Sequence, residues 1–112
     1  MDGPVRHVVM WRLRAETPFE RDAARRKVKD AFEGLRGRIE GLQTIEVGVD
    51  VSNVDYACDV VLVSEFATAE QLERYATHPE HLRVRQELGD LRIERHQVDY
   101  YPPSAGDAEA SE

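Results

Sequence analysis

The sequence has a single cysteine, Cys58, so no disulfide can form within one chain and nothing indicates an oxidising compartment. It also lacks a long hydrophobic run, because no segment approaches the roughly 18 consecutive apolar residues of a membrane-spanning helix. The first residues show no basic stretch followed by an apolar signal core. We therefore expect no membrane association and a cytoplasmic protein.

Positive charge is scarce as well: 15 lysines and arginines stand against 22 aspartates and glutamates, a net charge of −7. Binding to a phosphate backbone depends on many basic side chains, so we do not expect the protein to bind nucleic acid. The basic residues between Arg21 and Lys29 are interleaved with acidic ones, which predicts a solvated helix face.

The length of 112 residues leaves room for one domain with one core, and 41% hydrophobic residues are enough to build it. We predict a domain over residues 4–103. Residues 104–112 contain no large apolar side chain and are expected to form a disordered acidic tail.

Hydrophobic periodicity gives the order of the secondary-structure elements. Alternating apolar residues predict strands, helical spacing predicts helices, and Thr17-Pro18 and Thr68 mark helix starts. The expected order is a strand over 5–13, a helix from 18 to the glycine at 34, strands over 44–51 and 60–66, a helix from 68 that Pro79 interrupts, and a strand over 91–101. This α+β order is the ferredoxin-like βαββαβ arrangement with a four-stranded antiparallel sheet.

Such a sheet would have apolar residues on both faces. Two helical segments cover one face, and the residues expected there include His7, Trp11, Leu62 and Phe66. The other face would carry Val8, Met10, Val61 and Val63. An open apolar face of this size is typical of an interface, so we predict a homodimer with sheets packed face to face.

A candidate site lies on the helix-covered face. The last strand of a ferredoxin-like sheet runs antiparallel beside the first, so Asp99 can approach His7. A histidine that a carboxylate orients in an apolar pocket is suited to proton transfer. The alternative is a core histidine with one hydrogen bond. The pocket lining is predicted to comprise Trp11, Phe32, Leu62, Ser64, Phe66 and His78.

Tyr75, His78 and His81 recur at three-residue spacing, which can direct them to one side if the helical direction survives Pro79. They would then converge on the same pocket. In a structural alternative, His78 caps the helix that begins at Pro79, His81 bonds a backbone carbonyl, and Tyr75 only packs.

Several segments resemble the stress-responsive A/B barrel (Dabb) family, over roughly residues 4 to 101. They are the opening Val5-Arg6-His7-Val8-Val9-Met10-Trp11, the Gly48-Val49-Asp50 segment, the strand from Val60 to Phe66 and Tyr75-Ala76-Thr77-His78-Pro79-Glu80-His81. The resemblance implies a ferredoxin-like chain that pairs into a dimeric α/β barrel.

A plant member of that family closes a linear polyketide by an aldol reaction. It is similar in having a catalytic tyrosine and histidine at the positions of Tyr75 and His81, with a further histidine at the position of His7. The resemblance thus implies catalytic roles for Tyr75 and His81, with His7 and Asp99 in support. Trp11 is bulky and Ser64 is polar, so a long alkyl polyketide is not the expected ligand.

Three classes of function follow from the sequence. The first is a dimer that binds a small organic molecule and performs acid–base chemistry without a cofactor. The second is a non-catalytic stress-response or structural dimer, and the third is a cofactor-free or haem-linked ferredoxin-like monooxygenase. No histidine stands out as a haem ligand, and His78 and His81 have no third ligand at a fixed spacing, so we expect neither cofactor nor metal.

Overall fold

The computed structural model describes residues 3–103, and the predicted acidic tail at 104–112 lies outside them. The elements are the strands β1 (Val5–Leu13), β2 (Leu42–Val49), β3 (Val60–Phe66) and β4 (Arg92–Tyr100) and the helices α1 (Pro18–Glu33), α2 (Ala69–Tyr75) and α3 (Pro79–Leu88). All strand pairs are antiparallel, in the spatial order β2-β3-β1-β4. This confirms the predicted ferredoxin-like fold.

The helix starts follow the predicted capping. Thr17 and Thr68 each accept a hydrogen bond from the backbone N–H three residues ahead, at Glu20 and Gln71, and Pro18 takes the first helical position. Pro79 separates α2 from α3, as expected from the clash between a proline ring and a helical preceding residue. No helix among residues 3–103 is long and apolar enough to cross a membrane.

The second strand was predicted over 44–51, but it ends two residues earlier, at Val49. Asp50 closes it, since its carboxylate accepts hydrogen bonds from the Ser52 hydroxyl and the Asn53 backbone N–H. The chain turns there, and Val51, the last residue of the alternating pattern, is 92% exposed.

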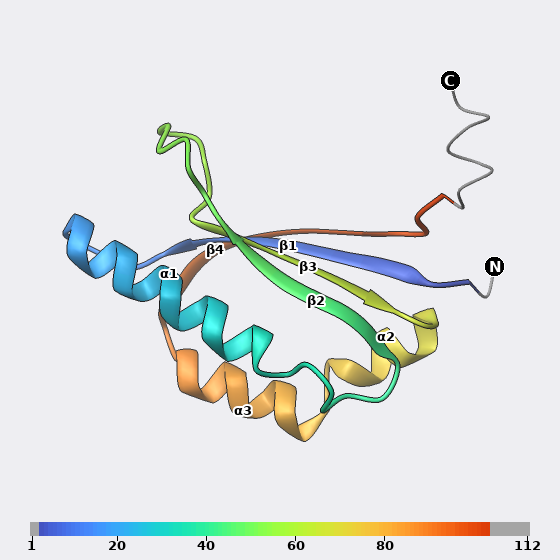
Figure 1. Cartoon of the computed structure of the whole chain (residues 1–112). Helices are drawn as coiled ribbons and strands as arrows, with labels where there is room; N and C mark the ends of the chain where they lie inside the picture. The colour runs from blue at the N-terminus through green and yellow to red at the C-terminus, as the bar shows by residue number, and fades with distance from the viewer. Residues whose placement is uncertain (1–2, 104–112) are drawn as a thin grey trace.

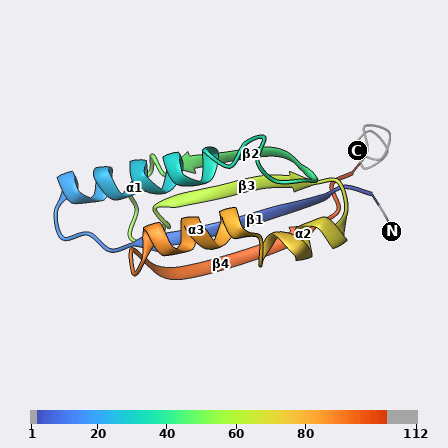
Figure 2. The same cartoon turned by 90° about the horizontal axis from the view of Figure 1, so that it is seen from below.

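The three helices lie on one face of the sheet, and no helix covers the opposite face (Figures 1 and 2). The core forms between α1, α3 and the helix-side residues of β1, β2 and β3. Strand β4 takes almost no part in it, because every residue from Ile93 to Tyr100 is exposed. The helices therefore leave room beside β4.

The interleaved charges at 21–29 predicted a helix face exposed to solvent, but one of its basic residues is buried. Arg25 is buried, and its guanidinium lies 3.0 Å from the carboxylate of the buried Asp59. Asp59 also accepts the Leu13 backbone N–H at 2.8 Å, so this pair connects α1 to the ends of β1 and β3. Sequence spacing gave no sign of the pairing, since 34 positions separate the two residues.

Candidate functional site

A pocket of about 540 Å³ lies between α3 and the strands β1 and β4, where the helices leave β4 uncovered. This volume is in the range of small-molecule sites. Its lining combines apolar, aromatic and basic side chains: His7, Val9, Trp11, Phe32, Leu62, Tyr75, Ala76, His81, Arg85, Gly89, Arg92, Ile93, Glu94 and Arg95.

His7 is buried at 6% exposure and points from β1 toward this pocket's side of the sheet. The register places it opposite Asp99 on β4, and its Nδ1 lies 2.6 Å from a carboxylate oxygen of Asp99. The other oxygen accepts a hydrogen bond from the Gln97 amide. A carboxylate can only accept, so Nδ1 carries a proton, and Nε2 is the ring nitrogen that this hydrogen bond leaves available.

Tyr75 ends α2 and is 4% exposed. Its ring packs against Phe66, with centroids 5.1 Å apart, and against His81, at 4.3 Å. Its hydroxyl is buried without a hydrogen-bond partner, a situation shared among residues 3–103 only with the amide oxygen of Gln71. Burial raises the pKa of the Tyr75 hydroxyl, so the group stays protonated and can donate.

His81, on α3, bonds to the Ala76 carbonyl through Nδ1 at 3.1 Å. A carbonyl accepts only, so Nδ1 is the protonated nitrogen and Nε2 of the neutral ring holds a free lone pair. Burial lowers the pKa of His81, although the Ala76 bond opposes this, and the positive charges of Arg85 and Arg92 lower it further. The neutral, basic form therefore dominates at pH 7.

Trp11, Phe32 and Leu62 all line the pocket. The Trp11 and Phe32 rings stack with centroids 5.1 Å apart at 14°, and this nearly buried pair forms the aromatic side of the pocket. They stack on one another rather than across the pocket, so the cavity persists beside them.

Ser64, Phe66 and His78 lie outside the lining, unlike the predicted arrangement. The Ser64 hydroxyl is buried and donates to the His7 carbonyl at 3.4 Å, and Phe66 is fully buried behind Tyr75. His78 caps α3, since its Nδ1 accepts the Glu80 backbone N–H at 3.0 Å. Of the inner face of β3, Leu62 reaches the pocket, whereas Ser64 and Phe66 do not.

The sequence analysis missed three arginines of the lining. Arg85 comes from α3, and Arg92 and Arg95 come from β4. Period two along the last strand places Arg95 on the same face as Asp99, and this signal was available. Arg92 joins that face only through the register shift at Leu13, which no sequence pattern shows.

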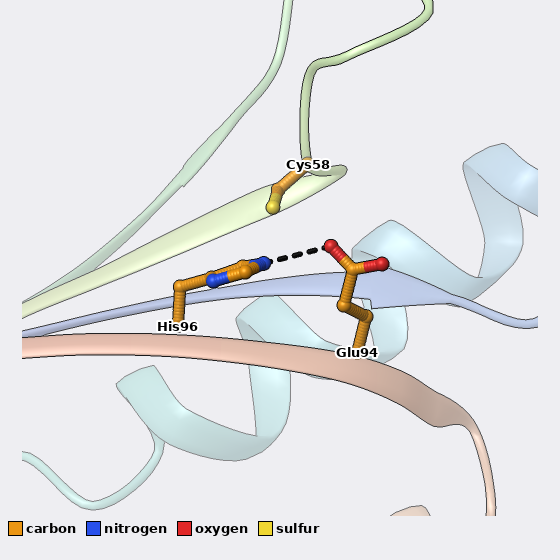
Figure 3. Close-up of side chains that lie close together, drawn as sticks. All are labelled: Cys58, Glu94 and His96. Carbon is orange, nitrogen blue, oxygen red and sulfur yellow. Dashed lines mark hydrogen bonds and ion pairs between the residues drawn. The ribbon is translucent and has the colours of Figure 1, made fainter.

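A second group of polar side chains lies on the opposite face, where Cys58, Glu94 and His96 point toward one another (Figure 3). Their ligand atoms lie within 4.8 Å, and Glu94 accepts a hydrogen bond from His96 at 2.7 Å. Glu94 is also paired with Arg12 at 3.4 Å. Burial, with Glu94 nearby, raises the pKa of the Cys58 thiol. The group is an ion-pair network beside a protonated thiol.

Comparison with known proteins gives a family match over nearly the whole chain. The model of the stress-responsive A/B barrel domain matches residues 5–102. No curated protein matches the sequence.

Solved structures show the same fold. A dimeric protein of unknown function with a ferredoxin-like fold from Bacteroides fragilis is 34% identical, with a TM-score of 0.77 over 89% of this chain and 97% of that one. A Dabb family protein from Mesorhizobium loti is 25% identical, with a TM-score of 0.69 over 91% and 99%. Hydroxynitrile lyase from Passiflora edulis is 14% identical, with a TM-score of 0.68 over 92% and 96%.

Proposed function

Since the chain belongs to the stress-responsive A/B barrel domain family, we propose that it is a homodimer whose chains each bind a small organic molecule and perform acid–base chemistry on it. The observation that carries this proposal is the Tyr75 hydroxyl, a buried donor without a partner at a pocket that also holds His81 and His7. Buried polar groups are nearly always satisfied, so an exception at a pocket favours a ligand as the partner.

The three side chains divide the chemistry between them. Tyr75 would donate its hydrogen bond to a carbonyl oxygen of the ligand, and the Nε2 lone pair of His81 would take a proton from the adjacent carbon. The negative charge that develops on the oxygen is then stabilised by the donor. The pKa shifts suit these roles, because the tyrosine stays protonated and the histidine stays neutral.

His7 would serve as a second proton carrier. Its centroid lies 6.3 Å from that of Tyr75, with the rings nearly perpendicular, so both side chains reach the same part of the pocket. Asp99 fixes the ring orientation and stabilises the protonated form during transfer. Asp99 thus acts through His7.

The homodimer would close the open face of the sheet. Val8, Val61 and Val63 are only partly covered there, and Met10 and Val98 are 41% and 61% exposed. The relative from Bacteroides fragilis is described as dimeric. The pocket lies on the helix-covered side of the sheet and the proposed interface on the other side (Figure 2), so each chain of the dimer would carry its own site.

A non-catalytic binding role is the second candidate. It is favoured by one pair of contacts, because His78 caps α3 and His81 bonds a backbone carbonyl, as the structural interpretation of the sequence expected. The free Nε2 of His81 and the unpartnered Tyr75 hydroxyl favour catalysis. The fold itself hosts enzymes, as the hydroxynitrile lyase shows for its own chain.

Proton exchange at carbon separates the two candidates. We would follow the methylene or methyl signal of phenylpyruvate, phenylacetone and acetophenone in D₂O by NMR. Catalysis predicts exchange with at least one ketone at about a hundred times the buffer rate or more, as positioned general bases typically provide. His81→Gln should remove the excess rate, because it deletes the base.

His78→Asn is the matched control, since asparagine also caps helices and His78 lies outside the pocket lining. It should exchange at the wild-type rate. Buffer-level exchange with all three ketones, or equal rates in wild type and His81→Gln, would contradict the catalytic role.

A further inference from the structure

One wall of the pocket is positively charged, although the chain as a whole carries −7. Arg85, Arg92 and Arg95 come from α3 and β4 and all line the pocket. Their charges act on one another, because Arg85 and Arg95 both help to lower the pKa of Arg92, after burial as the larger cause. A concentration of like charge in an acidic protein costs stability and is typical of functional sites.

These three arginines form no ion pair within the part of the chain that the structure describes. Arg83, on the same helix as Arg85, pairs with both Glu80 and Glu87. The lack of an ion pair at Arg85 is therefore not shared by Arg83, its neighbour on α3.

The carboxylates nearest to this wall are already engaged. Asp99 accepts hydrogen bonds from His7 and Gln97. Glu94 borders the pocket, but its side chain pairs with Arg12 and His96 in the network on the other face (Figure 3). Among residues 3–103, neither of these two carboxylates is therefore paired with the arginines of the pocket wall.

Arg92 lies against the aromatic pair of the pocket. Its guanidinium carbon lies 5.0 Å from the centroid of the Trp11 ring and 5.7 Å from that of Phe32. Stacking on aromatic faces holds a guanidinium in place while its N–H groups stay free to form a bidentate bond. A carboxylate is the planar acceptor that matches this fork.

We infer that the pocket's ligand is a small monocarboxylate, whose carboxylate binds Arg92 with support from Arg85 and Arg95 and whose body lies beside the Trp11–Phe32 pair. This inference rests on the proposed function for its site and names the class of substrate. The bound anion also acts on the base: it offsets the charges of Arg85 and Arg92, and the pKa of His81 therefore rises on binding.

Trp11 provides the signal for a binding test, since it is the only tryptophan of the sequence and lines the pocket. We would titrate the protein with benzoate and with its neutral isostere benzamide, and follow tryptophan fluorescence. Benzoate should quench saturably and bind about ten times more tightly than benzamide, or better, since hydrogen bonds to a charged group contribute about 1.5–3 kcal/mol.

Arg92→Met keeps an unbranched apolar stem but removes the charge, and should abolish the preference for benzoate. Arg83→Met is the matched control on α3 and should retain it. Equal affinity for benzoate and benzamide in wild type, or an unchanged preference in Arg92→Met, would overturn the inference.

Histidine NMR gives a readout that needs no variant of the wall. Benzoate at saturation should raise the pKa of His81, and benzamide should leave it unchanged. Neither measurement needs turnover, so failure of ketone exchange with benzoate selectivity intact would reject the catalysis alone. Exchange without benzoate selectivity would reject the anionic ligand alone.

Discussion

Tyr75→Phe should make the protein more stable. The buried hydroxyl of Tyr75 has no hydrogen-bond partner among the described residues, so folding takes it out of water without replacing its bonds. Leaving a buried donor unsatisfied costs about 1–3 kcal/mol, and phenylalanine keeps the ring contacts with Phe66 and His81. We expect a gain of about 1 kcal/mol in the free energy of unfolding, or about 4 °C in Tm.

Urea unfolding at one fixed protein concentration measures this gain, since the stability of a dimer depends on concentration. Tyr100→Phe is the control: the Tyr100 hydroxyl accepts a hydrogen bond from Arg6 at 2.9 Å, at an exposed site, and its loss should cost at most about 0.5 kcal/mol. A loss of 1 kcal/mol or more in Tyr75→Phe would refute the reasoning, because it would show that the hydroxyl stabilises the fold.

Three further predictions concern the interface, the core and pH. Val61→Lys on the open face should reduce the mass measured by sedimentation from that of two chains to that of one. Val51→Lys in the exposed loop is the control and should leave a dimer. A wild-type mass of one chain would contradict the interface. Asp59→Ala should lower the free energy of unfolding in urea by about 3 kcal/mol, because it leaves Arg25 buried without its partner. The exposed Asp22→Ala is the control and should cost less than about 1 kcal/mol. A cost that small in Asp59→Ala would show that the buried pair contributes little to stability. The lowered pKa of His81 in the folded chain means that the unfolded chain binds a proton at a higher pH, so the stability of the protein should fall as pH drops below about 6.5. His81→Gln should flatten this dependence. Parallel curves of stability against pH for wild type and variant would contradict the prediction.

The sequence predicted the fold closely because the relevant signals are local. Alternation in Val5–Leu13 and capping at Thr17 and Thr68 depend on neighbouring residues, and the structure confirms all three. The predicted end of β2 was wrong by two residues. The alternating pattern continues to Val51, but the turn at Asp50 ends the strand before it.

The site could be predicted only where topology brings residues together. His7 and Asp99 face each other because the fold pairs β1 with β4, and this pairing follows from the element order. Arg25 is buried because of how α1 packs, and Arg92 reaches the pocket because of a register shift between β1 and β4. Neither feature has a sequence signature. Ser64 and Phe66 share a strand face with Leu62 but do not line the pocket, because period two gives the direction of a side chain and not its position relative to a cavity.

The rate of ketone proton exchange in Tyr75→Phe tests the central claim most directly. If the hydroxyl is held unpartnered for a ligand, the variant should lose most of the excess exchange rate while its stability rises, a trade of stability for function. Wild-type exchange in Tyr75→Phe would contradict the account, because the buried hydroxyl would then have no part in the chemistry.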